Sequence, residues 1–165
     1  WNSNDTLFAY WIGTNDMLII DHTKYKKRIN ETIDSIVDTL FETLEGVYES
    51  GGRNFLFLNL QALDEMPNFN DTDKNDIKKS YLRFNDRLYK NSLNFYGLHN
   101  DTNVIIYNIK DEFQYIINNY QKYNFLIHND TYNSLKSQYP DIEDYIWTDN
   151  LHATSKANKI FAKDI

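Results

Sequence analysis

The sequence has 165 residues, of which 41% are hydrophobic and 25% are charged, and this balance predicts a globular protein rather than a disordered chain. A net charge of −7 argues against a protein that binds phosphate backbones, so we expect no nucleic-acid partner. No apolar run approaches the roughly 18 residues of a membrane-spanning helix, and the lack of cysteine excludes disulfides, thiolate nucleophiles and cysteine metal sites.

The first part of the chain predicts a strand, a long helix and a second strand. Residues 7–13 form a continuous apolar run, which is typical of a strand covered on both faces. Between residues 24 and 50 apolar side chains recur at steps of three and four, which predicts a long helix that Gly51 can end. Residues 54–60 predict the second strand, and the segment 61–72 predicts a loop.

A second helix, a third strand and a third helix are predicted next. Asp73 can cap a long helix that ends near Gly97. Residues 103–109 predict a strand, and Asp111 can cap a helix that continues through Tyr120. The order of elements so far is that of an α/β domain with a parallel sheet.

The last part of the sequence is polar and rich in tyrosine up to about Tyr145. Thr154 or Ser155 can then cap a closing helix. We find no repeat and no interdomain linker, so we expect residues 1–165 to form a single α/β domain. Three strands are few for a parallel sheet of this kind.

A glycine followed by polar residues ends the first predicted strand, at Gly13, Thr14, Asn15 and Asp16. In open α/β sheets functional groups gather at the carboxyl ends of the strands, and an asparagine N–H there can donate to a developing oxyanion. Alternatively, these residues only turn the chain and cap the next helix.

A carboxylate stands three residues before a histidine near the end of the chain, at Asp149 and His152. In a turn, this spacing lets the carboxylate accept from Nδ1–H and leaves Nε2 free as a general base. The alternative is a surface histidine beside a helix-capping acid. The other three histidines have no partners at metal-ligand spacing, and no glycine-rich phosphate loop occurs, so we expect no metal and no cofactor.

The compartment is indicated by five N-x-[ST] sequons, which favour a secreted, extracellular glycoprotein. Their asparagines are Asn4, Asn30, Asn70, Asn100 and Asn129.

Five segments of the sequence carry a resemblance to a known family. In chain order they are WIGTNDM, GGRNFLFLNLQALDEMP, FNDRLYKNSLNF, NVIIYNIKDEF and DNLHATS. The first and the last are similar to the third and fifth motif blocks of the SGNH, or GDSL-type, hydrolase family, and the other three resemble the segments between these blocks, in the same order. The resemblance covers nearly the whole sequence and is closest to the fungal carbohydrate-acetylesterase branch of that family.

This resemblance implies a three-layer α/β/α, flavodoxin-like fold with a parallel sheet, here truncated to about three strands. It implies that Asn15 is an oxyanion donor presented by a turn at Gly13, that His152 is the general base and that Asp149 orients it. The residues it implies in supporting roles are Asp16, Trp11 and Thr14.

The nucleophile of the family is missing from this sequence. The resemblance places its serine, in a Gly-Asp-Ser block, and the glycine of a second block upstream of Phe8, and no Gly-x-Ser occurs in the chain. We therefore expect a domain that is incomplete at its N-terminus, without its first two strands. A pseudoenzyme that lost this part is the alternative.

The resemblance implies a serine-dependent ester hydrolase, with acetyl esters of plant cell-wall carbohydrate, such as an acetylated oligosaccharide, as the first substrate expectation. Lipid or other short-chain acyl esters come second. We expect this chain alone to be inactive, and to self-associate through its first strand, which the missing strands would leave as an exposed edge. The alternative function is a non-catalytic glycan-binding or interaction module.

Overall fold

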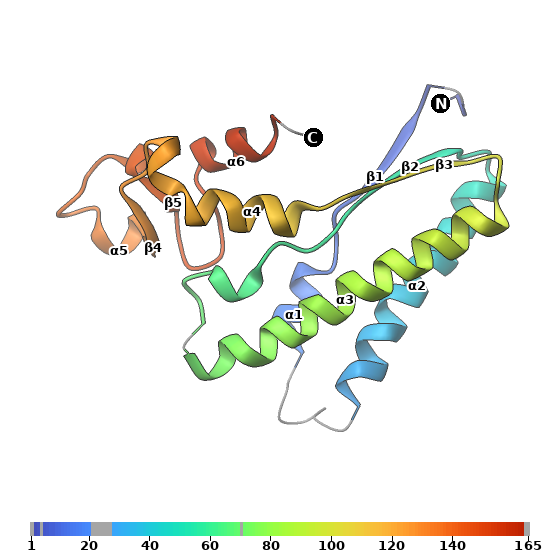
Figure 1. Ribbon diagram of the computed structural model, residues 1–165, viewed down its shortest axis with the longest axis horizontal. Coiled ribbons are helices and arrows are strands. Elements are labelled where there is room, and N and C mark those ends of the chain that lie inside the picture. Colours follow the sequence, from blue (N-terminus) through green and yellow to red (C-terminus); the bar gives the residue numbers. More distant parts are fainter. Residues whose placement is uncertain (1, 4, 21–27, 70, 164–165) are drawn as a thin grey trace. The chain divides into compact units, whose positions relative to one another are not determined.

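The computed structural model describes residues 2–3, 5–20, 28–69 and 71–163. Figure 1 shows the chain, which divides into two compact units that we describe separately. The first unit contains residues 1–60 and 76–109, and the second contains residues 61–75 and 110–165. Some residues that the sequence analysis considered lie outside the described ranges: the sequon asparagines Asn4 and Asn70, one of the other three histidines, His22, and the start of the first predicted helix, residues 24–27.

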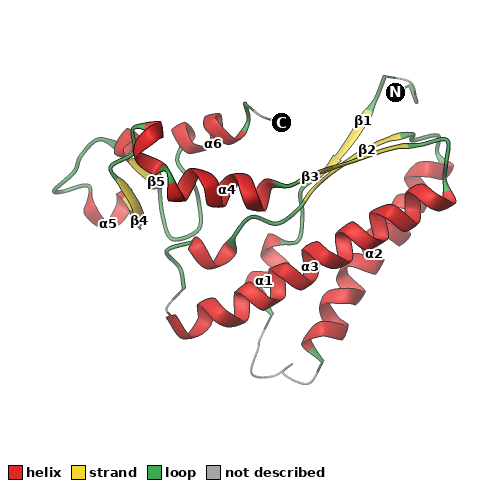
Figure 2. Ribbon diagram, in the orientation of Figure 1, coloured by secondary structure: helices red, strands yellow, loops and turns green. Residues whose placement is uncertain are grey.

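The first unit is built on a three-stranded parallel sheet. Its strands are β1 (Leu7–Tyr10), β2 (Asn54–Leu58) and β3 (Asn103–Tyr107), and their order is β1-β2-β3 (Figure 2). Both neighbouring pairs are parallel, which confirms the predicted α/β class. β1 therefore lies at an edge of this sheet.

Three helices connect these strands: α1 (Thr14–Ile19), α2 (Ile29–Glu49) and α3 (Asp71–Leu98). Aromatic contacts place α2 and α3 on one face of the sheet, where they run side by side (Figure 1). The ring of Phe41 in α2 lies 5.4 Å from that of Phe57, and the ring of Phe95 in α3 lies 5.2 Å from that of Phe55. Phe55 and Phe57 are fully buried, so this face forms the core of the unit.

The opposite face of the same sheet is exposed. Leu7 is 51% exposed and Ile105 is 53% exposed, while Phe8 and Tyr10 stack on the β2 rings of the covered face. The prediction of a strand covered on both faces is therefore wrong for β1. It failed because aliphatic and aromatic side chains alternate in β1, so an apolar run can still have one exposed face.

Ion pairs join α2 to α3 along their length. Arg83 donates to both carboxylate oxygens of Asp34, at 2.7 and 2.5 Å. One turn further on, Arg87 and Asn91 donate to Asp38 at 2.8 to 2.9 Å. Two bidentate arginine–carboxylate pairs thus fix the register of the helix pair.

The second unit contains a parallel sheet that the sequence analysis missed, formed by β4 (Ile127–Thr131) and β5 (Tyr145–Trp147). β4 was missed because its residues, IHNDT, are mostly polar. β5 was missed because three residues are too few to show a strand pattern. Its helices are α4 (Ile109–Asn118), α5 (Tyr132–Leu135) and α6 (Ser155–Phe161), with short 3₁₀ turns at Leu63–Glu65, Tyr120–Tyr123 and Ile142–Asp144.

Aromatic side chains form the core of this unit. The ring of Phe113 lies 4.8 Å from Phe161 and 5.4 Å from Trp147, and Phe125 is fully buried. None of the helices in the described ranges has the length and apolar composition needed to cross a bilayer.

The helix ends agree with the sequence in part. The side chain of Thr154 accepts from the backbone N–H of Ala157, which confirms Thr154 as the cap of α6. Gly51, with φ of 97°, follows α2 as predicted. Asp73 and Asp111, however, lie within the first turns of α3 and α4 rather than at their caps, so these two predictions are wrong.

Candidate active site

Gly13 turns the chain from β1 into α1. Its φ is +106°, a left-handed conformation that favours glycine. A Cβ at this position would lie 2.4 Å from Cζ of the buried Phe84, so both backbone and packing require glycine here. The backbone N–H of Met17 then donates to the Gly13 carbonyl at 3.0 Å and starts the helix.

Asn15 is the second residue of α1, and its side chain is exposed. Within the described residues its amide makes no hydrogen bond, so the amide is available to a ligand. Thr14 and Asp16 are half-buried beside it, and Trp11 is 48% exposed just after β1. Their roles remain predictions.

Two more asparagines lie at the carboxyl edge of this sheet, and the sequence analysis missed them. Asn59 follows β2, Asn108 follows β3, and the Asn59 amide donates to the Asn108 side-chain oxygen at 2.9 Å. Because parallel strands place their carboxyl ends at one edge, the shared position after a strand was the available signal.

Asp149 and His152 form a hydrogen-bonded pair in the second unit. The carboxylate oxygens of Asp149 lie 2.9 and 3.0 Å from Nδ1 of His152. The His152 side chain is 76% exposed, and within the described residues its Nε2 has no hydrogen-bond partner. The predicted contact is therefore present, and it leaves Nε2 open to a substrate.

The loop that carries this pair is closed by backbone hydrogen bonds. The N–H of Thr148 donates to the His152 carbonyl at 2.8 Å, and Trp147 and Ala153 form an antiparallel bridge. Ala153 is thus part of this closure. Thr154 then donates from its hydroxyl to the Tyr145 carbonyl at 2.9 Å, which ties the loop to β5.

Asp149 is held as a carboxylate. One of its oxygens accepts from the backbone N–H groups of Leu151 and His152, at 2.9 and 2.8 Å. The Leu151 N–H, followed by the ring and backbone of His152, holds the pKa of the Asp149 carboxyl below its usual value, although partial burial opposes this. An ionised Asp149 favours the tautomer of His152 that is protonated at Nδ1.

A cavity of about 390 Å³ lies beside this pair. Its lining residues are Asn68, Thr131, Asn133, Ser134, Asp149, Asn150, Leu151 and His152, all in the second unit. His152 itself is thus one of the residues that line the cavity. Sequence reasoning did not identify the lining asparagines, because they are distant along the chain and β4 was not predicted.

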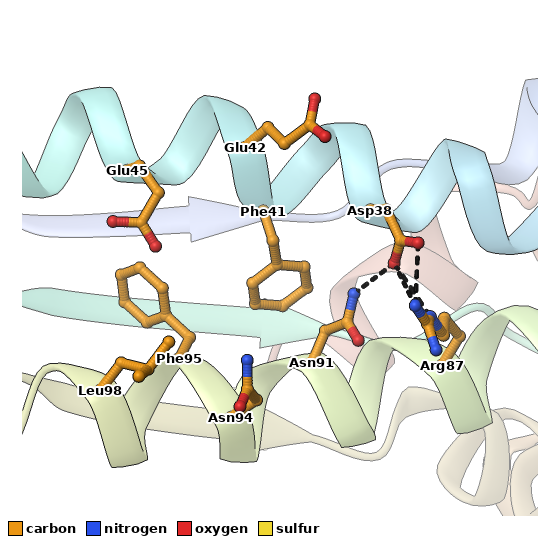
Figure 3. Close-up of a pocket in the computed structure, with 9 residues that line it drawn as sticks. All are labelled: Asp38, Phe41, Glu42, Glu45, Arg87, Asn91, Asn94, Phe95 and Leu98. Atoms are coloured by element: carbon orange, nitrogen blue, oxygen red, sulfur yellow. Dashed lines mark hydrogen bonds and ion pairs between the residues drawn. The ribbon is translucent and has the colours of Figure 1, made fainter.

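A second cavity, of about 380 Å³, lies between α2 and α3 in the first unit (Figure 3). Figure 3 shows Asp38 bound to Arg87 and Asn91, with Glu42 and Glu45 further along the same helix. No histidine or serine lines it, so it holds neither the imidazole base nor the hydroxyl nucleophile of a serine hydrolase.

The structure therefore brings Asp149 and His152 together in the second unit, while Gly13, Thr14, Asn15 and Asp16 lie together in the first. In the described part of the chain, no group of three or more His, Cys, Asp or Glu side chains is placed to hold a metal ion.

Comparison with known proteins adds a family and two relatives. A family model described as GDSL-like Lipase/Acylhydrolase matches residues 2–165. An acetylesterase of Thermothelomyces thermophilus is 28% identical over 67 residues, which are 41% of this chain and 21% of that protein. An acetylesterase of Hypocrea jecorina is 33% identical over 61 residues, 37% of this chain and 18% of that protein. The aligned segments thus span about a fifth of each relative.

Proposed function

Because the chain belongs to the GDSL-like lipase/acylhydrolase family, we propose that it is the base-bearing part of a serine-dependent ester hydrolase. The observation that carries this proposal is the Asp149–His152 pair, with Nδ1 held by the carboxylate and Nε2 open beside a cavity. In this assignment His152 is the general base, Asp149 orients it and Asn15 donates to the oxyanion.

The chemistry follows the roles of a Ser-His-Asp triad. Nε2 of His152 takes the proton of the serine hydroxyl as that oxygen attacks the ester carbonyl, and the charge that develops on the carbonyl oxygen is bound by the Asn15 amide. His152 then gives the proton to the leaving alcohol. It next takes a proton from the water that attacks the acyl-enzyme, and returns this proton to the serine oxygen as the acid is released.

The acyl group we propose is acetyl, carried on a carbohydrate. Both relatives described above are fungal acetylesterases, which supports the acetyl assignment. The sequons at Asn30, Asn100 and Asn129 have exposed asparagines, which supports the proposal of a secreted glycoprotein.

The 165 residues supply no Gly-x-Ser nucleophile, so we expect the chain alone to be inactive. The test is release of acetate from an acetylated methyl glycoside, compared with an Asp149→Asn, His152→Ala double variant. An alkyl ester is preferable to nitrophenyl acetate, whose good leaving group permits attack by any exposed imidazole. Acetate release above the double variant would contradict this expectation.

The base assignment is tested in the same polypeptide extended upstream to its start codon. With a Gly-Asp-Ser block present, His152→Ala should lower kcat by at least about 10³-fold and Asn15→Ala by about 10²–10³-fold. Turnover that survives His152→Ala would exclude His152 as the base. An extended polypeptide with no such serine would favour the glycan-binding module instead.

We also propose that the chain self-associates through the edge strand β1 and the exposed face next to it. Leu7 in β1 is 51% exposed, and an open apolar strand is a template for pairing with another chain. Sedimentation velocity over a range of concentrations tests this, and a monomer at every concentration would contradict it.

A further inference from the structure

We propose that the cavity beside His152 is the subsite for the leaving alcohol, and that the amides of Asn68, Asn133 and Asn150 bind its hydroxyl groups. This assignment rests on the proposed function, because it takes His152 as the catalytic base. Beyond that function, it specifies which part of the ester occupies the cavity and which residues select the alcohol.

The position of the base indicates which part of the ester, the acyl group or the alcohol, lies in the cavity. A histidine that takes the serine proton must next deliver it to the oxygen of the leaving alcohol, so that oxygen has to lie within hydrogen-bond reach of Nε2. Nε2 is open and His152 lines the cavity. The alcohol therefore occupies the space next to the imidazole.

The residues that line the cavity indicate which kind of alcohol it can bind. Asn68, Asn133 and Asn150 are exposed, and within the described ranges their side-chain amides make no hydrogen bond. Each amide offers donors and an acceptor, which is the match for hydroxyl groups that both donate and accept. Three such groups around one cavity fit a polyhydroxylated alcohol.

Other ligand classes fit less well. Leu151 is the only aliphatic hydrocarbon side chain of the lining, so a long alkyl alcohol would find little apolar surface. A cationic alcohol would need a carboxylate partner, but Asp149 is the only carboxylate of the lining, and His152 and two backbone N–H groups already bind it. With no lysine or arginine in the lining, an anionic alcohol such as a phosphorylated sugar has no partner of opposite charge.

Backbone contacts hold the asparagines in place relative to His152. The N–H of Asn133 donates to the carbonyl of Thr148, at 3.1 Å, directly before the loop that carries the catalytic pair. Thr131 caps α5 by accepting from Ser134, whose hydroxyl lies 2.8 Å from the Thr131 hydroxyl. This fixed backbone makes Asn133 the best-placed of the three amides to discriminate between alcohols.

The test is an NMR titration of the 165-residue chain with methyl β-xylopyranoside, which contains no ester and needs no nucleophile. We expect millimolar binding that shifts the side-chain NH₂ signals of Asn68, Asn133 and Asn150. Asn133→Ala should weaken this binding about five- to tenfold, the effect of one lost hydrogen bond. Asn94→Ala, at an exposed helical position in the other unit, should leave it unchanged.

Three outcomes would overturn the subsite: an equal response to 1-butanol, shifts confined to residues outside the cavity, or undiminished binding in both Asn133→Ala and Asn68→Ala. Amide spectra of each variant establish that it is folded. If the extended enzyme keeps its activity in His152→Ala while the glycoside still binds, the assigned base fails and the binding site stands. If His152→Ala abolishes activity and no glycoside binds, the subsite fails and the base stands.

Discussion

At the scale of single residues, Gly13 has the strictest requirement of the predicted site. Its left-handed backbone and the contact with Phe84 leave no room for a side chain. Gly13→Ala should therefore lower the free energy of unfolding by about 2–4 kcal/mol, from backbone strain and overpacking together. Urea denaturation measures this.

The control for Gly13 is Gly46, in the last turn of α2. A Cβ there meets nothing within 4 Å, so Gly46→Ala should stabilise the protein by about 0.5–1 kcal/mol. Equal effects of the two substitutions would show that packing at Gly13 is looser than its geometry indicates.

The contact between Asp149 and His152 predicts which ring nitrogen of His152 carries the proton. Asn at position 149 keeps the size of aspartate, but its NH₂ can donate to Nδ1 and so favours the His152 tautomer protonated at Nε2. At pH 8, ¹⁵N shifts should therefore report an Nδ1-protonated ring in the parent chain and an Nε2-protonated ring in Asp149→Asn. His128, which stacks on Tyr120 instead, is the internal control. An unchanged tautomer at His152 would show that Asp149 does not set it.

At the scale of elements, the α2–α3 pair depends on charge. The hydrogen bond from Arg83 holds the pKa of Asp34 below its usual value. Because the native pKa is lowered, the stabilisation is complete above the unfolded value of about 3.9 and is lost as the pH falls through the native pKa.

Asp34→Asn should accordingly cost about 1 kcal/mol of unfolding free energy at pH 7, since Arg83 is 40% exposed and water screens the pair. The difference between the two proteins should persist to about pH 4 and shrink below it. Asp76→Asn, which breaks an exposed 3.4 Å pair with Lys79, should have almost no effect at either pH. A cost for Asp34→Asn that is constant down to pH 2.5 would contradict the ionic origin.

Some helices and strands could be predicted from the sequence and others could not. The long helix α2 was predictable because its apolar side chains follow one period over many residues, and the strand β2 because it is a continuous apolar run. Thr154 was predictable because its cap needs only local contacts. β4 and β5 were not predictable, because the residues of β4, IHNDT, show no apolar pattern and β5 has only three residues. The spacing of Asp149 and His152 predicted their contact. The cavity could not be predicted, because Thr131 and Asn133 line it and the sheet that positions them was not predicted.

At the scale of the whole molecule, the three-stranded sheet has an open side. Parallel sheets are normally covered on both faces, yet the row formed by Ala9, Leu56 and Ile105 lies on the face opposite α2 and α3. Ala9 and Ile105 are exposed there. An exposed apolar row of this kind adds little to the free energy of folding, but it favours association with another protein surface.

Folding and association should therefore respond differently to one substitution. Ile105→Thr keeps a β-branched side chain, so it should change the free energy of unfolding by less than about 0.5 kcal/mol while weakening self-association in sedimentation velocity. Phe57→Leu, on the covered face of the neighbouring strand, should do the reverse and cost about 1–2 kcal/mol of stability. If Ile105→Thr unfolds the chain, the open face is part of the core of the isolated protein. If it leaves association unchanged, contact between copies is made by the backbone of the β1 edge rather than by this face.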